Sequence, residues 1–277
     1  MLVDNPILNS PFEEPARYWA YEEGQPMLKE GRRPAGYYLK ARTRGPHIAI
    51  LEEEFVPLDL VNAIRERVKA WREKSYPGVT SITRQFLNLW SNPERERRLF
   101  FCQREAVETL IWLVELLRKL LEGEIKTRRR KNLVQARSFA EMLEQTIRRY
   151  QNRAIEAAQV IEELIALAKE MRAASSRGEV LGLSEEELAF YDALETNDSA
   201  VKVLGEPKLR QIAQELVRTV RANVTIDWTL RENVRAQLRV RVKRILRKHG
   251  YPPDKQETAA TTVLQQAELL CQNWTAG

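Results

Sequence analysis

The sequence predicts a mainly α-helical protein, in which a small amino-terminal β-hairpin and several helices precede an all-helical bundle with one long helix. Three observations lead to this fold class. Residues 94–206 contain no proline and residues 124–177 contain no glycine, the two residues that most often interrupt helices. Apolar residues through most of the chain recur three and four positions apart, as on one face of a helix. Patterns typical of extended structure are concentrated in residues 1–56.

The first predicted region covers residues 1–114 and combines strands with helices. Residues 36–41 and 47–51 are rich in β-forming side chains, and the polar segment between them predicts a hairpin with a longer loop. Apolar spacing then predicts one helix from about residue 58 and another from about residue 82. Pro93 is expected to open a third helix, because proline is favoured in the first turn.

The second predicted region, residues 115–277, is expected to be entirely helical. Apolar residues from Leu143 to Met171 are spaced alternately four and three apart, which predicts the seam of one long helix packed against others. At 1.5 Å per residue that helix would extend roughly 50 Å. Additional apolar positions beside the seam favour a helical bundle over an isolated coiled coil.

Local signals predict the later helix boundaries. Residues 184–187 (SEEE) form a capping box. Gly205 is expected to end one helix and Pro207 to open the next. A helix with an amino-terminal cap at Asp227 is expected to end at Gly250, and a final helix to span residues 254–274.

Composition narrows the function class. The chain has 277 residues and a formal net charge of +6, with 43% hydrophobic and 30% charged residues, which argues against both disorder and a membrane protein. Its longest apolar stretch, residues 109–114, is far too short to cross a bilayer. Two cysteines and two histidines offer little for a disulfide framework or a metal site. We therefore expect a cytoplasmic protein without a resident metal or a membrane partner.

The sequence also argues against nucleotide hydrolysis. No glycine is followed by lysine and no aspartate by glutamate. A Walker A loop requires Gly-Lys-Ser/Thr to hold phosphates, and helicase motors add an Asp-Glu pair for Mg²⁺. Two Glu-x-Lys tripeptides, Glu124-Ile125-Lys126 and Glu206-Pro207-Lys208, match part of a restriction-nuclease motif, but their polar surroundings favour solvated surface charges. We expect no catalytic, cofactor-binding or metal-binding residue.

Positive charge is concentrated in residues 218–248, which hold ten Lys/Arg and two acidic residues. This stretch is +8, so the rest of the chain sums to −2. Such density predicts sequence-independent contact with a nucleic-acid backbone. Alternatives are a solvated helix face or a surface that docks on an acidic protein. The candidate phosphate-contacting residues, which include a second basic run before the predicted long helix, are Arg128, Arg129, Arg130, Lys131, Arg235, Arg239, Lys243, Arg244, Arg247 and Lys248.

Residues 5–114 resemble the amino-terminal region of restriction endonuclease R subunits of the type III-like, superfamily 2 helicase group. Residues 5–15 (NPILNSPFEEP), 30–37 (EGRRPAGY) and 99–112 (LFFCQREAVETLIW) carry the resemblance. In that family the last stretch precedes the Walker A strand and contains a glutamine similar to the adenine-reading residue of helicases. Gln103 matches it. Because no phosphate loop follows, we expect Gln103 to be a helix-surface or packing residue.

Residues 116–276 resemble the carboxyl-terminal helical domain of type I restriction enzyme R subunits. The resemblance implies a role in joining an R subunit to its methyltransferase and specificity partners; full-length members also use ATP and Mg²⁺. It is carried by residues 132–144 (NLVQARSFAEMLE), 150–155 (YQNRAI), 160–169 (VIEELIALAK), 190–194 (FYDAL), 227–232 (DWTLRE) and 249–254 (HGYPPD).

The two resemblances together predict a truncated or chimeric R subunit without motor or nuclease motifs. We expect it to act as a helical docking module for a methyltransferase–specificity complex, for the DNA backbone, or for both. One alternative is a component of an ATP-dependent restriction endonuclease that becomes competent only with other subunits. Another is a free-standing, non-specific DNA-binding module.

Overall fold

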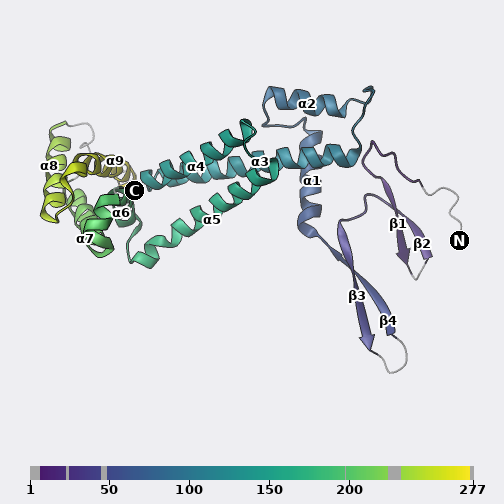
Figure 1. Ribbon diagram of the computed structural model, residues 1–277, viewed down its shortest axis with the longest axis horizontal. Helices are drawn as coiled ribbons and strands as arrows, with labels where there is room; N and C mark the ends of the chain where they lie inside the picture. Colours follow the sequence, from purple (N-terminus) through teal and green to yellow (C-terminus); the bar gives the residue numbers. More distant parts are fainter. Residues whose placement is uncertain (1–6, 23–24, 45–48, 197, 224–231, 275–277) are drawn as a thin grey trace. The chain divides into compact units, whose positions relative to one another are not determined.

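The computed structural model describes residues 7–22, 25–44, 49–196, 198–223 and 232–274. It separates into two compact units, residues 1–116 and 117–277. The predicted boundary at 114/115 lies two residues before this division. Helices dominate the described residues and strands occur only near the amino terminus, which confirms the mainly α class (Figure 1).

The first unit begins with two separate antiparallel hairpins. Strands β1 (Arg17–Glu22) and β2 (Gln25–Glu30) pair with each other, and β3 (Gly36–Arg44) pairs with β4 (Ala49–Pro57). The second hairpin confirms the predicted one and extends further along both strands, with a register from Gly36 opposite Pro57 to Arg44 opposite Ala49. The first hairpin was not predicted from the sequence.

The helices of the first unit pack around a small aromatic core. They are α1 (Asp59–Glu73), α2 (Ser81–Ser91) and the first part of α3 (Phe101–Arg129). Thr80 caps α2, because its side chain accepts a hydrogen bond from the Thr83 amide. The core contains Trp71, Tyr76 and Leu87, with the partly buried side chains of Val79, Trp90, Ile111 and Trp112 against it.

The predicted start of the third helix at Pro93 is wrong, since α3 begins at Phe101. The side chain of Gln103 accepts a hydrogen bond from the Phe100 amide at 3.0 Å, which satisfies one of the free donors at the start of the helix. The Phe101 amide donates to the carbonyl of Pro11 at 2.8 Å. The position of a proline did not predict where α3 begins, because hydrogen bonds to the Pro11 carbonyl and to the Gln103 side chain fix the start of the helix.

Among its described residues, the second unit contains the end of α3 and six further α-helices. They are α4 (Leu133–Gln151), α5 (Ala157–Leu181), α6 (Glu185–Glu195), α7 (Asp198–Asn223), α8 (Glu232–Lys248) and α9 (Gln256–Trp274), with the short 3₁₀ helix η2 (Pro253–Lys255) before α9. Helices α6 to α9 enclose the main hydrophobic core, which includes Phe190, Leu216, Leu246 and Val263. Figure 1 shows α4 and α5 running beside each other in opposite directions.

The single long helix predicted through residues 143–171 is wrong. Helix α4 ends at Gln151, and α5 begins at Ala157 after a reversal. Arg153 occupies the left-handed region with φ of 56°, and Glu156 forms a capping box with Gln159. Of the seam residues, Leu143, Leu164 and Met171 are buried, and they lie on two facing helices. The longest described helix is α3, with 29 residues.

Other predicted boundaries are confirmed. Ser184 and Glu187 form the expected capping box of α6. Gly205 has φ of 71° and interrupts α7, and Pro207 follows as the helix resumes. The predicted cap at Asp227 lies outside the described residues. Within the part of the chain that the structure describes, no helix combines the length and apolar character needed to cross a bilayer.

The α4–α5 reversal gives a stability prediction. Arg153→Gly should raise the free energy of unfolding by roughly 0.5–1 kcal/mol, because glycine adopts positive φ without the steric cost of a side chain. Arg172→Gly, at an exposed position inside α5, should lower it by about 1 kcal/mol. Urea denaturation of both variants checks the opposite signs. A lower free energy of unfolding in Arg153→Gly would contradict the positive φ of residue 153 in the α4–α5 reversal.

Candidate functional site

The basic helix α8 buries one face in the helical core. Leu238, Val242, Ile245 and Leu246 are buried, and Val234 packs beside them. This apolar stripe was expected from the sequence. It fixes which of the basic side chains face neighbouring helices and which face outward.

Most of the basic side chains predicted to contact phosphate are engaged in ion pairs. On the flank facing α9, Arg235 pairs with Glu268 at 2.6 Å, and Arg239 and Lys243 both pair with Glu257. The hydrogen bond from Lys243, together with that from Arg239, lowers the pKa of Glu257. Two carboxylates of α9 therefore engage three of the basic side chains of α8.

The end of α8 is tied to α7 through Glu215. Lys248 Nζ lies 2.8 Å from Glu215 Oε1, and His249 Nε2 lies 2.7 Å from Glu215 Oε2. These hydrogen bonds, with that from His249 first, lower the pKa of Glu215. Lys248 is exposed, but its ammonium group is paired with a carboxylate of α7.

Two predicted cations of α8 remain open. Arg244 and Arg247 are exposed and form no ion pair among the residues that the structure describes. They lie one helical turn apart on the outward face of α8, beside the exposed Val240. We call Arg244 and Arg247 the α8 crest. Of the predicted set on α8, the crest is the part available to a phosphate backbone.

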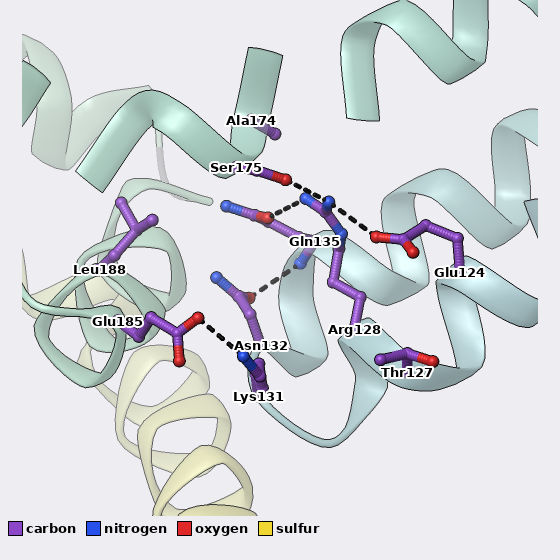
Figure 2. A pocket seen from close by; sticks show the side chains of 10 residues that line it. All are labelled: Glu124, Thr127, Arg128, Lys131, Asn132, Gln135, Ala174, Ser175, Glu185 and Leu188. Carbon is purple, nitrogen blue, oxygen red and sulfur yellow. Dashed lines mark hydrogen bonds and ion pairs between the residues drawn. The ribbon is translucent and has the colours of Figure 1, made fainter. Parts of the chain in front are cut away.

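Arg128 does not belong to an exposed basic patch, which corrects its predicted placement. Its side chain is 9% exposed, and Figure 2 shows its guanidinium directed inward from the end of α3. It donates to Ser175 Oγ at 2.7 Å, to the Met171 carbonyl at 3.0 Å and to Gln135 Oε1 at 3.0 Å. These bonds use the guanidinium to join α3, α4 and α5.

The remaining residues of the second basic run lie on the surface. Lys131 Nζ pairs with Glu185 Oε1 at 2.8 Å, which connects the α3–α4 turn to the start of α6 (Figure 2). Arg129 and Arg130 are exposed. Phosphate contact by this run stays a prediction for these exposed side chains.

A small polar pocket of about 160 Å³ is lined by Asn132 and Gln135, among others (Figure 2). Both residues bond the buried carboxylate of Asp192. Asn132 caps α4 by accepting from the Gln135 amide, and its Nδ2 donates to Asp192 Oδ2 at 2.5 Å. Gln135 Nε2 donates to the same oxygen at 2.6 Å, and Arg177 lies 3.1 Å from Asp192 Oδ1. Burial raises the pKa of Asp192, although these donors offset part of the effect. Each polar group has an internal partner, so the arrangement fastens helices together.

An apolar groove of about 380 Å³ lies next to this pocket, between α3 and α5. Leu117, Leu120, Leu121, Ala168, Met171 and Arg172 are among its lining residues. The side chain of Leu120 is 61% exposed, although its neighbour Leu121 is buried. This groove was not predicted from the sequence. Its signal was the leucine spacing in the second half of α3, which marks an apolar face that the neighbouring helices cover only in part.

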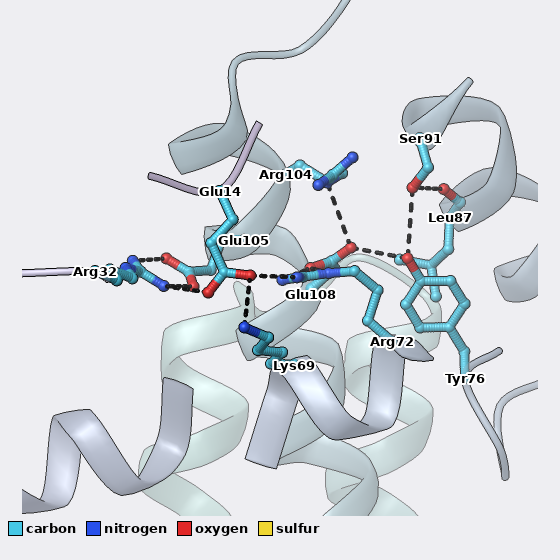
Figure 3. Close-up of polar contacts among 10 residues, drawn as sticks. All are labelled: Glu14, Arg32, Lys69, Arg72, Tyr76, Leu87, Ser91, Arg104, Glu105 and Glu108. Carbon is cyan, nitrogen blue, oxygen red and sulfur yellow. Dashed lines mark hydrogen bonds and ion pairs between the residues drawn. The ribbon is translucent and has the colours of Figure 1, made fainter. Parts of the chain in front are cut away.

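The charged residues of the first unit also form internal pairs (Figure 3). Glu108 is fully buried and accepts hydrogen bonds from Tyr76 Oη and Arg72 Nε, both at 2.8 Å. Arg32 makes a bidentate pair with Glu105. Burial would raise the pKa of Glu105, but the hydrogen bond and charge of Arg32 outweigh it and lower the pKa. Gln103 is exposed and caps α3, as described above.

The candidate nuclease and metal residues do not assemble into a site among the described residues. Glu124 pairs with Arg128, and Glu206 with Arg210, each one helical turn away. In the same part of the chain, no group of three or more His, Cys, Asp or Glu side chains is placed to hold a metal ion.

Comparison with known proteins identifies the family. Residues 100–273 match the family described as "Type I restriction enzyme HindI endonuclease subunit-like, C-terminal". The chain belongs to this family. The match contains the whole of the α8 crest and the α3–α5 groove. It begins at residue 100, so the separate resemblance of residues 5–114 to type III-like subunits stays a prediction.

Two relatives agree with this assignment. The type I restriction enzyme HindI endonuclease subunit of Haemophilus influenzae is 34% identical over 203 residues, which cover 73% of this chain and 18% of that protein. The putative type I restriction enzyme MjaIXP endonuclease subunit of Methanocaldococcus jannaschii is 34% identical over 152 residues, which cover 54% and 14%. The chain thus spans less than a fifth of the length of either relative. No solved structure matches it.

The pair between α7 and α8 gives a pH prediction. The lowered pKa of Glu215 means that its stabilisation is present above its ordinary pKa of about 4.3 and is lost as the pH falls through the lower, folded-state value. Glu215→Gln should therefore cost up to about 1 kcal/mol near pH 7, and the difference from wild type should shrink below about pH 4. Denaturation across this pH range checks it. Glu141→Gln, at an exposed position on α4, is the control; the same pH-dependent difference there would contradict the prediction.

Proposed function

We propose that this chain acts as a helical docking module within a type I restriction system. In this role it helps to assemble the complex and does not itself catalyse a reaction. The observation that carries the proposal is the partly exposed apolar groove between α3 and α5, inside the region that matches the family. The relatives' names describe endonuclease subunits, which implies that such chains work in multisubunit complexes. The truncated or chimeric origin expected from the sequence stays a prediction.

The groove favours an amphipathic helix as its occupant. Its leucines offer an apolar surface at helical spacing, and Arg172 supplies a positive charge at its rim that forms no ion pair among the described residues. Helices dock into such grooves through an apolar face, with charges at the edge that set orientation. We assign the occupant to the methyltransferase–specificity complex, as a helix with an acidic residue opposite Arg172.

ATP and Mg²⁺ do not enter the proposed role of this chain. Its sequence has no Gly-Lys phosphate loop and no Asp-Glu pair. Any ATP-dependent cleavage in which the chain takes part would therefore depend on catalytic residues contributed elsewhere in the complex. This proposal is compatible with the alternative that the chain is a component of an ATP-dependent restriction endonuclease that becomes competent only with other subunits.

The docking proposal is tested by co-purification of the full chain with the methyltransferase–specificity complex of the same locus. Leu120→Asp should weaken association about tenfold or more, because it places a charge where a leucine would be buried. Val203→Asp, at a similarly exposed valine of α7 outside the groove, should have little effect. Equal binding by wild type and Leu120→Asp, or equal losses in both variants, would contradict the groove as the docking surface.

A second candidate function is contact with the DNA backbone, and the unpaired α8 crest favours it. Replacing both Arg244 and Arg247 by glutamine should weaken binding to duplex DNA and reduce the slope of log K against log salt by about one to two units. Replacing Arg235 and Arg239, which pair with Glu268 and Glu257, should change DNA binding less. Fluorescence anisotropy at several salt concentrations checks this. A larger effect of the paired arginines would contradict the assignment to the crest.

A further inference from the structure

The first unit holds an open pocket of about 420 Å³ that is lined by arginines. Among the described residues, Arg17, Arg32, Arg33 and Arg65 line it, and no described acidic side chain does. Its volume lies within the range of roughly 300–1,000 Å³ typical of ligand sites. Pairing with internal carboxylates dominates elsewhere in the described chain, so this pocket stands apart chemically.

Arg17 and Arg33 have no carboxylate partner among the described residues, whereas Arg32 and Arg65 lie near Glu105. Arg32 is held by Glu105 (Figure 3). Arg33 donates only to the hydroxyl of Tyr38, at 3.3 Å, and lies over its ring. Arg17 donates to the Leu8 carbonyl at 3.5 Å. Arg65 forms no ion pair with a described residue, although its charge contributes to the lowered pKa of Glu105. Guanidinium groups that share a pocket without acids repel one another and favour a bound anion.

The pocket is held together by hydrogen bonds between distant segments. Asn9 Oδ1 accepts from the amides of Ala16 and Arg17 at 2.9 and 3.1 Å, which fixes the approach to β1. Asn62 of α1 bonds both the amide and the carbonyl of Ala35, at 2.8 and 3.1 Å. This second clamp holds the segment of Arg33 against the helix of Arg65. The backbone segments that carry the arginines are therefore placed before any ligand arrives, which lowers the entropic cost of binding.

The rest of the lining indicates the kind of anion. Ile7 is 77% exposed, and with Leu8, Pro15 and the ring of Tyr18 it adds an apolar wall beside the arginines. Guanidinium groups bind phosphate oxygens through paired hydrogen bonds, and an apolar wall accommodates a sugar or base. We propose that this pocket binds a phosphate group carried by a nucleic-acid strand. This inference is independent of the docking groove and of the α8 crest, which lie in the other unit.

The test compares two arginines of the same helix in the full chain. Arg65→Gln removes a pocket charge, whereas Arg67→Gln removes an exposed charge that does not line the pocket. Binding of a fluorescein-labelled single-stranded oligonucleotide is measured at several salt concentrations. Arg65→Gln and Arg33→Gln should each weaken binding about tenfold and lower the salt slope by about 0.7, and Arg67→Gln should change affinity less than twofold. Thermal melting verifies that each variant is folded.

Two competitors identify the source of the anion. If inorganic pyrophosphate binds wild type but not Arg65→Gln, while oligonucleotide binding is equal in both, the phosphate site stands and its ligand is a free phosphate. If Arg33→Gln and Arg65→Gln weaken binding of the oligonucleotide alone, the ligand is a phosphate of a nucleic-acid strand. Equal binding of both probes by wild type, Arg33→Gln and Arg65→Gln would overturn the proposal. Displacement by a polyglutamate peptide as effective as by the oligonucleotide would also overturn it, since the pocket would then recognise carboxylates.

Discussion

The second unit depends on a buried carboxylate and its donors. Asp192 is 4% exposed and receives hydrogen bonds from Asn132 and Gln135 of α4 and Arg177 of α5. A charge removed from water is tolerated only when such donors replace the lost hydration. Because these donors lie on two other helices, the carboxylate of α6 sets how α4 and α5 meet the core. Gln266 of α9 reinforces this junction through the Leu133 amide and the Lys131 carbonyl, both at 2.8 Å. The α3–α5 groove and the neighbouring polar pocket are lined by residues of the helices that this arrangement positions.

The position of charge matters more than its amount. The basic stretch that contains α8 has the highest positive charge density in the sequence, yet most of its candidate phosphate contacts meet carboxylates of α7 and α9. Exposed pairs of this kind contribute little to stability, typically up to about 1 kcal/mol each, but they orient the side chains and reduce the local potential. Three arginines of the first unit that no charge count singles out, Arg17, Arg33 and Arg65, form no ion pair with a described residue. The electrostatic potential at the surface therefore depends on which charges pair in the folded chain, and the amino-acid composition does not show this.

Features fixed by neighbouring residues were predictable from the sequence. The capping box at Ser184, the break at Gly205 and the apolar stripe of α8 each depend on side chains within a few positions. The α4–α5 reversal was not predictable in this way, because it uses neither glycine nor proline and the apolar spacing continues through it. Arg128 was misplaced because its partners Met171 and Ser175 are 43 and 47 positions away. The α3–α5 groove and the arginine pocket are of this second kind, since each combines segments that are distant in the sequence. The α8 crest, in contrast, lies within one helix.

The proposed role without catalysis follows from the same internal pairing. A general acid or base needs a titratable group that is free to meet a substrate, and a metal site needs several carboxylates or imidazoles that converge. Glu105, Glu108, Asp192, Glu215 and Glu257 are each held by cationic side chains of the chain itself. Among the groups that the described surface leaves without an internal partner are apolar side chains in the α3–α5 groove and guanidinium groups in the arginine pocket and on the α8 crest. Apolar grooves recognise protein helices and unpaired guanidinium groups recognise phosphate, so these surfaces suit a subunit that brings a protein partner and a nucleic acid into one assembly.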